Sequence, residues 1–247
     1  MVNLNKEKIK LITFDLYNTL ARFWPPVEEI QVLACSRLGV KVSQTNISSG
    51  YLLADTFMAK ENAIYPVRDR QREERKIFFN KYEQIILQGA GIESDLQFAD
   101  LVWKEIQKIP YALKLFDDVI PVLEQLRLLG YKLIILSNVD RNSDELMDFL
   151  GLRGQLDYFL TSRDIGADKP HSPIFLESLK LANVKPFEAI HIGDQFDTDI
   201  LGARKVGMNT ILIDRRNEYR NFNPLPNEIR NNVDIIQSLN ELLLVLN

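Results

Sequence analysis

The second half of the chain alternates short apolar runs with longer segments in which apolar residues recur every three to four positions. Each run is compact and rich in Ile, Leu or Val, as expected of a parallel strand that is covered on both faces. The first intervening helical segment, DVIPVLEQLRLLG, stops at Gly130. This alternation is typical of βαβ units that build a parallel sheet. The predicted strands are 132–138, 158–162, 189–194, 209–214 and 233–238.

One further run, KLITF at residues 10–14, has the same character but is separated from the next strand by a long stretch of different composition. That stretch has helical spacing and is more polar, and the prolines of FWPPVEE stiffen its entry. We therefore predict an α/β fold, a doubly wound parallel sheet, with an inserted all-helical cap domain. The predicted core comprises residues 1–21 and 114–247, and the predicted cap residues 22–113.

The composition favours small-molecule chemistry. The chain has 247 residues, 46% of them hydrophobic, and a formal charge of −4 with dispersed Lys and Arg, so we expect no nucleic-acid or membrane-surface partner. No apolar run approaches the roughly 18 residues that span a bilayer, and the N-terminal stretch lacks the pattern of a signal peptide. We expect a cytoplasmic protein, as a monomer or small homo-oligomer, with a small-molecule substrate.

Polar residues stand at the predicted carboxyl ends of several strands, which in open parallel sheets is where ligands bind. Lysine and aspartate side chains from separate parts of the chain should therefore meet in one crevice. By contrast, the single Cys35 lies in a helical segment and His191 within a strand, where buried structural roles are expected. The candidates for chemistry are Asp15, Ser137, Asn138, Lys169, Asp194 and Asp199.

Three of these candidates are carboxylates. Two bare carboxylates about 4 Å apart repel by roughly 4 kcal/mol at an effective dielectric constant near 20, so a cluster of three indicates a bound cation. Oxygen ligands favour a hard ion such as Mg²⁺. Asp194 and Asp199 also flank a predicted helix start, where either alone is typical of a structural cap.

Four stretches, FDLYNTL, ILSNVD, GADKPHSPIF and HIGDQFDTDILGARKVG, occur in this order at the predicted strand ends. Together they resemble the four motifs of haloacid dehalogenase-like (HAD) superfamily hydrolases that carry a helical cap after the first motif. The run LSNVDR and the five-residue step from Asp194 to Asp199 also resemble one branch of that superfamily. The resemblance covers nearly the whole chain and implies a Rossmann-like core, a Mg²⁺ ion and a hydrolytic reaction.

The resemblance also implies roles for the acidic residues. Asp15 is the nucleophile, which forms a covalent aspartyl intermediate that water then cleaves. Asp15 and Asp194 coordinate Mg²⁺ directly, the backbone carbonyl of Tyr17 supplies another oxygen, and Asp199 acts directly or through a water.

The remaining motif residues bind and orient the substrate in this family. Lys169 balances the negative charge of Asp15 and of the transferred group. Ser137 donates its hydroxyl to a phosphate oxygen and Asn138 helps to orient the group, although this pair also suits an ordinary helix-capping turn. Thr19 positions the loop of the first motif next to the substrate.

Tyr17 departs from the phosphatases of the superfamily, most of which have a second aspartate there as general acid and base. Such catalysis is typically worth about 10²–10⁴-fold, and a phenol with a pKa near 10 is a poor base at neutral pH. Tyrosine at this position resembles the haloacid dehalogenases, in which the aspartate displaces a halide that needs no proton.

The fourth motif instead resembles that of the phosphatases. Dehalogenases of this type need no metal and have a pattern of serine and asparagine at these positions. GDQFDTD retains both acidic positions, and carboxylates around an unused cavity are electrostatically costly. We therefore predict a Mg²⁺-dependent phosphatase of a small phosphorylated metabolite. A metal-independent 2-haloacid dehalogenase and a weakly catalytic phosphometabolite-binding protein remain as alternatives.

Overall fold

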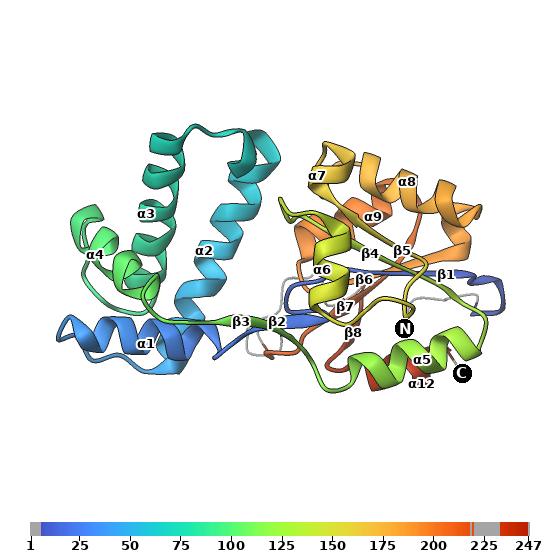
Figure 1. The fold of residues 1–247 in the computed structure, drawn as a ribbon, viewed down its shortest axis with the longest axis horizontal. Helices are drawn as coiled ribbons and strands as arrows, with labels where there is room; N and C mark the ends of the chain where they lie inside the picture. The colour runs from blue at the N-terminus through green and yellow to red at the C-terminus, as the bar shows by residue number, and fades with distance from the viewer. Residues whose placement is uncertain (1–5, 218, 220–232, 247) are drawn as a thin grey trace. The chain divides into compact units, whose positions relative to one another are not determined.

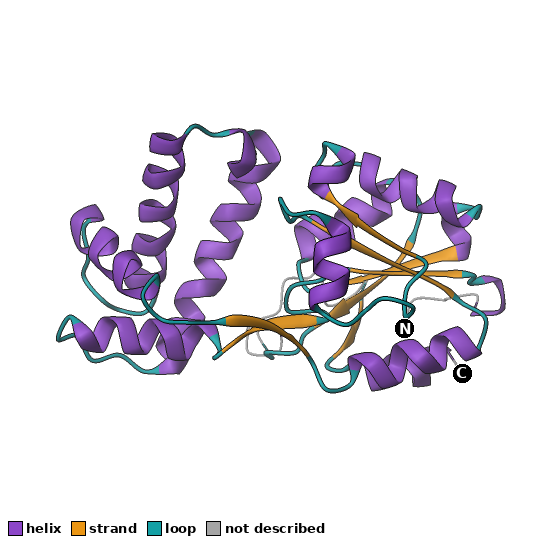
Figure 2. Cartoon of the chain, in the orientation of Figure 1, coloured by secondary structure: helices purple, strands orange, loops and turns teal. Residues whose placement is uncertain are grey.

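The structure, a computed structural model, describes residues 6–217, 219 and 233–246. The chain divides into two compact units, which Figures 1 and 2 show as ribbons. Met1–Arg22 and Lys114–Asn247 form the first, here called the core unit, and Phe23–Leu113 forms the second, the helical unit.

A six-stranded parallel sheet runs through the core unit, as predicted, in the order β5-β4-β1-β6-β7-β8. The central strand β1 is the first in the sequence and pairs with two strands that come from much later in the chain. The strands are β1 (Leu11–Phe14), β4 (Lys132–Ser137), β5 (Tyr158–Thr161), β6 (Ala189–Gly193), β7 (Asn209–Ile213) and β8 (Asp234–Ile236).

Helices cover both faces of this sheet, which confirms the doubly wound α/β fold (Figure 1). Helices α5 (Val119–Leu128) and α12 (Leu239–Leu246) pack together on one face, and α8 (Pro173–Ala182) and α9 (Leu201–Lys205) lie on the other. The shorter elements are η1 (Lys6–Lys8), α6 (Ser143–Phe149), α7 (Ser162–Ile165), η3 (Pro186–Glu188) and η4 (Phe196–Ile200).

The helical unit is built from four α-helices around two clusters of buried apolar side chains. Helices α2 and α3 approach closely because Gly50 has no side chain: an added Cβ would lie 2.1 Å from the carbonyl oxygen of Ile86. None of the described helices is long and apolar enough to cross a membrane. The elements are α1 (Val27–Arg37), α2 (Gln44–Ile64), η2 (Val67–Asp69), α3 (Arg72–Gly89) and α4 (Leu96–Ile106).

Two short strands carry the chain out of the core unit and back into it. They are β2 (Ala21–Trp24) and β3 (Ala112–Leu115), which pair with each other in a separate two-stranded sheet. The sequence pattern did not predict them, because each is only four residues long and neither is continuously apolar.

Candidate active site

Asp15 lies immediately beyond the carboxyl end of the central strand. Its backbone N–H continues the ladder with β6 by donating to the carbonyl oxygen of Ile192 at 2.8 Å. The side chain is buried, and its Oδ1 accepts a 2.6 Å hydrogen bond from Nζ of Lys169. Burial raises the pKa of Asp15 to about 6, with Lys169 opposing the shift and Asp199 adding to it.

The chain reverses direction directly after Asp15 in a turn that its own backbone closes. The N–H of Asn18 donates to the carbonyl oxygen of Ala21 at 2.7 Å, and the N–H of Ala21 donates to that of Leu16 at 2.8 Å. Asn18 has a φ of 55°, a left-handed conformation that asparagine tolerates better than most residues. Tyr17 is half-buried in this turn.

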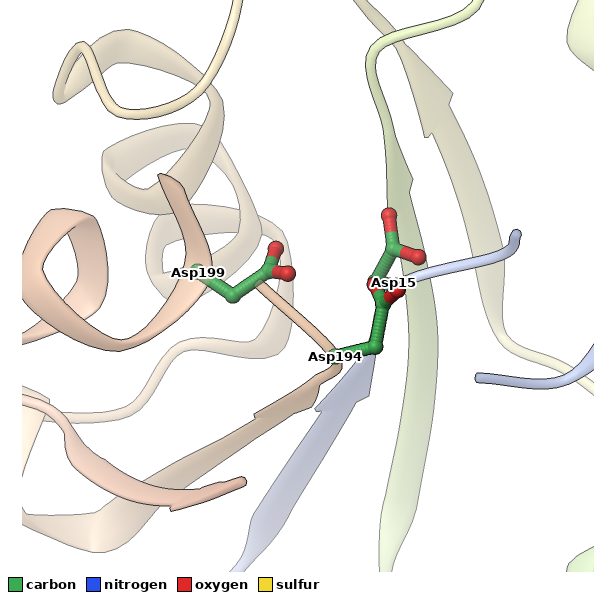
Figure 3. A group of neighbouring side chains, drawn as sticks. All are labelled: Asp15, Asp194 and Asp199. Carbon is green, nitrogen blue, oxygen red and sulfur yellow. The ribbon is translucent and has the colours of Figure 1, made fainter. Parts of the chain in front are cut away.

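The three predicted carboxylates come together. One oxygen from each of Asp15, Asp194 and Asp199 lies within 4.8 Å of the other two (Figure 3). The ammonium of Lys169 lies 2.6 Å from an oxygen of Asp15 and 2.6 Å from an oxygen of Asp199. The close spacing of three carboxylates and the all-oxygen donor set fit a hard divalent cation such as Mg²⁺.

Asp199 occupies space that Gly193 leaves open at the end of β6. A Cβ added to Gly193 would lie 2.3 Å from the carboxyl carbon of Asp199, so only glycine fits at this position. Asp199 itself lies in η4, a single turn of π-helix, a form that occurs frequently at functional sites. The widened turn and the missing side chain together admit the carboxylate to the cluster.

Three donors hold the Asp199 carboxylate. Its Oδ1 accepts from Nζ of Lys169 at 2.6 Å and lies 3.2 Å from Nε2 of His191, while Oδ2 accepts from the backbone N–H of Gln195 at 3.0 Å. Burial alone would raise the pKa of Asp199, but Lys169 and His191 hold it well below its ordinary value. Asp199 is therefore ionised.

Lys169 is fixed at both its backbone and its ammonium group. The Asn138 side chain accepts from the Lys169 N–H at 2.7 Å and donates to the Lys169 carbonyl oxygen at 2.9 Å. Burial opposes the charge, yet Asp15 and Asp199 hold the pKa of Lys169 above its ordinary value. The amide of Asn138 thus contacts the lysine loop, whereas the sequence suggested that it orients a substrate group.

Ser137 and Thr19 present buried hydroxyl groups at the same edge of the sheet. Both side chains are fully buried, and neither hydroxyl oxygen has a hydrogen-bond partner within the part of the chain that the structure describes. An unpaired buried polar group typically costs about 1–3 kcal/mol, so such groups call for a ligand or another function. Both hydroxyls suit the oxygens of a bound anion.

His191 and Arg215 contact residues of this site but were not predicted as site residues. His191 bridges Asp199 and Thr13, with its Nδ1 at 2.8 Å from Oγ1 of Thr13. Burial lowers the pKa of His191, so the ring is neutral. No sequence pattern indicated this contact, because a histidine within an apolar strand is typical of a core residue.

Arg215, which follows β7, holds the loop of the first motif. Its Nε donates to the carbonyl oxygen of Thr19 at 2.7 Å, and its Nη atoms donate to both carboxylate oxygens of Asp118 at 3.0 Å. The guanidinium carbon lies 4.0 Å from the ring centroid of Phe116. One side chain therefore ties the turn after Asp15 to the start of α5.

Replacing Arg215 by Met should lower the free energy of unfolding by about 3–5 kcal/mol, because the nearly buried Asp118 carboxylate loses its charged partner. Urea denaturation of the wild type and variant measures this change. Arg153→Met is the matched control, since Arg153 pairs with Asp148 on the surface and should matter much less. Equal, small effects of the two substitutions would contradict the anchoring role of Arg215.

Comparison with known proteins identifies the family of the chain. The sequence matches the haloacid dehalogenase-like hydrolase family over residues 9–207. The chain belongs to that family. In this haloacid dehalogenase-like hydrolase, the four stretches that suggested the family lie on the strand ends and loops described above.

Its relatives include proteins named for phosphatase activity. Human haloacid dehalogenase-like hydrolase domain-containing protein 3 is 29% identical over 213 residues, which cover 83% of this chain and 82% of the relative. The glyceraldehyde 3-phosphate phosphatase of Methanopyrus kandleri is 39% identical over 137 residues, 55% of this chain and 58% of the relative. The first relative supports the family branch that the sequence motifs indicated.

Solved structures of both phosphatases and dehalogenases share the fold of this hydrolase. The HAD phosphatase from Thermococcus onnurineus has a TM-score of 0.55 at 23% identity and covers 97% of this chain and 98% of its own. At this level of identity the likeness shows the fold and does not distinguish the two chemistries.

Proposed function

We propose that the protein is a Mg²⁺-dependent phosphatase that hydrolyses a small phosphorylated metabolite through an aspartyl-phosphate intermediate. The observation that carries this proposal is the convergence of Asp15, Asp194 and Asp199 on one point beside Lys169. A metal-independent dehalogenase has no use for three carboxylates this close together, whose mutual repulsion a bound cation would relieve.

In the proposed reaction, a carboxylate oxygen of Asp15 bonds to phosphorus as the bond to the leaving oxygen breaks. Water then attacks the phosphorus of the aspartyl phosphate, which releases inorganic phosphate and restores the carboxylate. Lys169 compensates the negative charge of both Asp15 and the transferred group. The unpaired hydroxyls of Thr19 and Ser137 donate to the phosphate oxygens.

The proposed Mg²⁺ ligands are Asp15, Asp194 and the carbonyl oxygen of Tyr17, with Asp199 acting directly or through a water. When bound, the ion supplies positive charge that offsets the charge of the phosphoryl group. The motif residues of this chain therefore divide into a metal-binding set and a phosphate-binding set. Asp15 belongs to the metal-binding set and is also the nucleophile.

The tyrosine at position 17 limits which leaving groups the proposed substrates can have. The position offers no carboxylate to protonate the leaving oxygen, so leaving groups of low pKa, such as acyl phosphates, should react best. Since the Methanopyrus kandleri relative is named for glyceraldehyde 3-phosphate, small phosphorylated sugars belong among the compounds to test. We also propose that the helical unit acts as the cap that selects the substrate.

Tyr17 is also the one observation that favours 2-haloacid dehalogenation as a second function, because halide leaves without a proton. A metal-dependence measurement separates the two functions. Dehalogenation would proceed in the presence of a chelator, whereas the proposed phosphatase reaction would not.

The test is an activity screen over phosphorylated metabolites, including acyl phosphates, beside a panel of 2-haloacids, each with Mg²⁺ and with a chelator. We expect Mg²⁺-dependent release of phosphate and a rise in thermal stability on adding Mg²⁺, because the ion binds the folded site and not the unfolded chain. Calorimetry that detects no Mg²⁺ binding at millimolar concentration would overturn the proposal. Tight binding of phosphate analogues without turnover would instead identify a binding protein.

A further inference from the structure

We propose that His191, oriented by Thr13, is a positioning residue that donates a hydrogen bond to Asp199 and thereby tightens Mg²⁺ binding at the active site. This inference rests on the metal site proposed above. It concerns a residue that contacts neither substrate nor metal in that proposal.

The sheet register brings the two supporting residues together. Thr13 of β1 and His191 of β6 are direct partners in the parallel ladder, so their side chains project from the same face of the sheet. Asp15 and Gly193 are two residues further along each strand and share that face. Asp199 fills the space above Gly193, which places its carboxylate next to the His191 ring.

The contacts of Thr13 decide which ring nitrogen of His191 carries the proton. The Thr13 hydroxyl has one proton and two candidate acceptors: His191 Nδ1 at 2.8 Å and the carbonyl oxygen of Ile190 at 3.4 Å. If it donates to Nδ1, the neutral ring carries its proton on Nε2 and donates to Asp199. The other tautomer would turn a lone pair toward an ionised carboxylate, which is unfavourable. The contacts therefore select the Nε2–H tautomer.

The ring is also held from the side of α8. Phe175 packs edge-on against His191, with ring centroids 5.2 Å apart and an interplanar angle of 86°. Both side chains are fully buried, and a Cβ added to Gly202 would lie 3.0 Å from the Phe175 ring. Close packing on this side leaves the imidazole one orientation, with Nε2 directed at Asp199.

The consequence is a carboxylate with one free acceptor position. An ionised carboxylate has about four lone-pair sites, and Lys169, His191 and Gln195 occupy three of those on Asp199. The two on Oδ1 are both used, so the remaining one is on Oδ2. Without the His191 donor, Oδ1 regains a free site and the carboxylate loses one of the contacts that orient it. Supports of this kind are typically worth about 10–100-fold in metal affinity.

The first test is the tautomer in the metal-free wild type. The sequence contains only two histidines, His171 and His191, so ¹⁵N-detected imidazole spectra are simple to assign, with His171→Asn identifying the other signal. We expect a proton on Nε2 of His191, the nitrogen that faces Asp199. A ring with its proton on Nδ1 and none on Nε2 would overturn the inference, whatever the protein binds.

The second test compares two substitutions of nearly equal size. His191→Gln retains a donor for Asp199 and an acceptor for the Thr13 hydroxyl, whereas His191→Met has neither. Calorimetry should show Mg²⁺ affinity close to that of the wild type for the Gln variant and about 10–100-fold weaker for the Met variant. A purely structural role predicts that affinity follows stability, so thermal melts of both variants accompany the titrations.

The outcomes separate this inference from the proposed function. If the wild type binds Mg²⁺ and the Met variant binds it equally well, His191 has no positioning role and the metal site stands. If the Gln variant is as weak as the Met variant at equal stability, the hydrogen bond to Asp199 is not the cause, and the inference fails. If the wild type does not bind Mg²⁺, the proposed function fails first and this role with it.

Discussion

Replacing Asp15 by Asn should reduce turnover to background, a loss of at least about 10⁴-fold, while the protein remains folded. The amide keeps the shape of the side chain but cannot act as a carboxylate nucleophile. Lys169 retains its contact with Asp199 in this variant, so no buried ammonium is left without a partner. Phosphate release measures the loss, and circular dichroism checks the fold.

The control for this substitution lies in the fourth motif. Asp197 is exposed between the two fourth-motif aspartates, so Asp197→Asn makes the same chemical change outside the carboxylate cluster. It should leave turnover nearly unchanged. If the Asp15 variant kept most of its activity, both the nucleophile and the aspartyl-phosphate intermediate would be wrong.

Tyr17→Asp should increase the hydrolysis of alkyl phosphates by up to about 10²–10⁴-fold, because it restores an acid where phosphatases of the superfamily protonate the leaving oxygen. Aryl and acyl phosphates should gain much less, since their leaving groups depart without a proton. The gain depends on how the turn directs the new side chain, and Asn18 already supplies the left-handed residue that closes this turn.

Tyr17→Asn is the matched control, because it removes the same ring and has nearly the shape of aspartate without its acidity. The ratio of the Asp to the Asn variant isolates the proton transfer from the loss of the phenol. Rates on an alkyl and an acyl phosphate decide the result. Equal rates for the two variants on the alkyl phosphate would show that the position does not deliver a proton in this protein.

The sequence predicted the parts of the site that follow from strand periodicity. Apolar runs mark the strands, and polar residues at their carboxyl ends must meet at one edge of a parallel sheet, so the clustering of Asp15, Asp194 and Asp199 could be inferred before the structure. The buried structural role predicted for Cys35 also follows from periodicity. The side chain is fully buried, and its burial, together with the smaller effect of Glu83, raises the pKa of its thiol to about 11.

Contacts that depend on side-chain geometry could not be predicted in this way. Asn138 could equally cap a helix, orient a substrate or bind the lysine loop, and only the structure shows its two hydrogen bonds to Lys169. His191 carries the periodicity of a core residue, and its contact with Asp199 depends on a π-helical turn that no sequence pattern specified. Arg215 contacts the first-motif loop from 196 residues further along the chain.

The pairing of β2 with β3 has a consequence for how the chain folds. The central strand β1 cannot join β4 until the ends of the intervening helical unit meet, and closing a flexible loop of about ninety residues costs on the order of 4 kcal/mol in chain entropy. Once β2 and β3 are paired, those ends lie about one strand spacing apart, roughly 4.8 Å. A helical unit that folds early therefore removes most of the entropic barrier to completing the central sheet. It brings β1, which precedes it in the sequence, close to β4, which follows it.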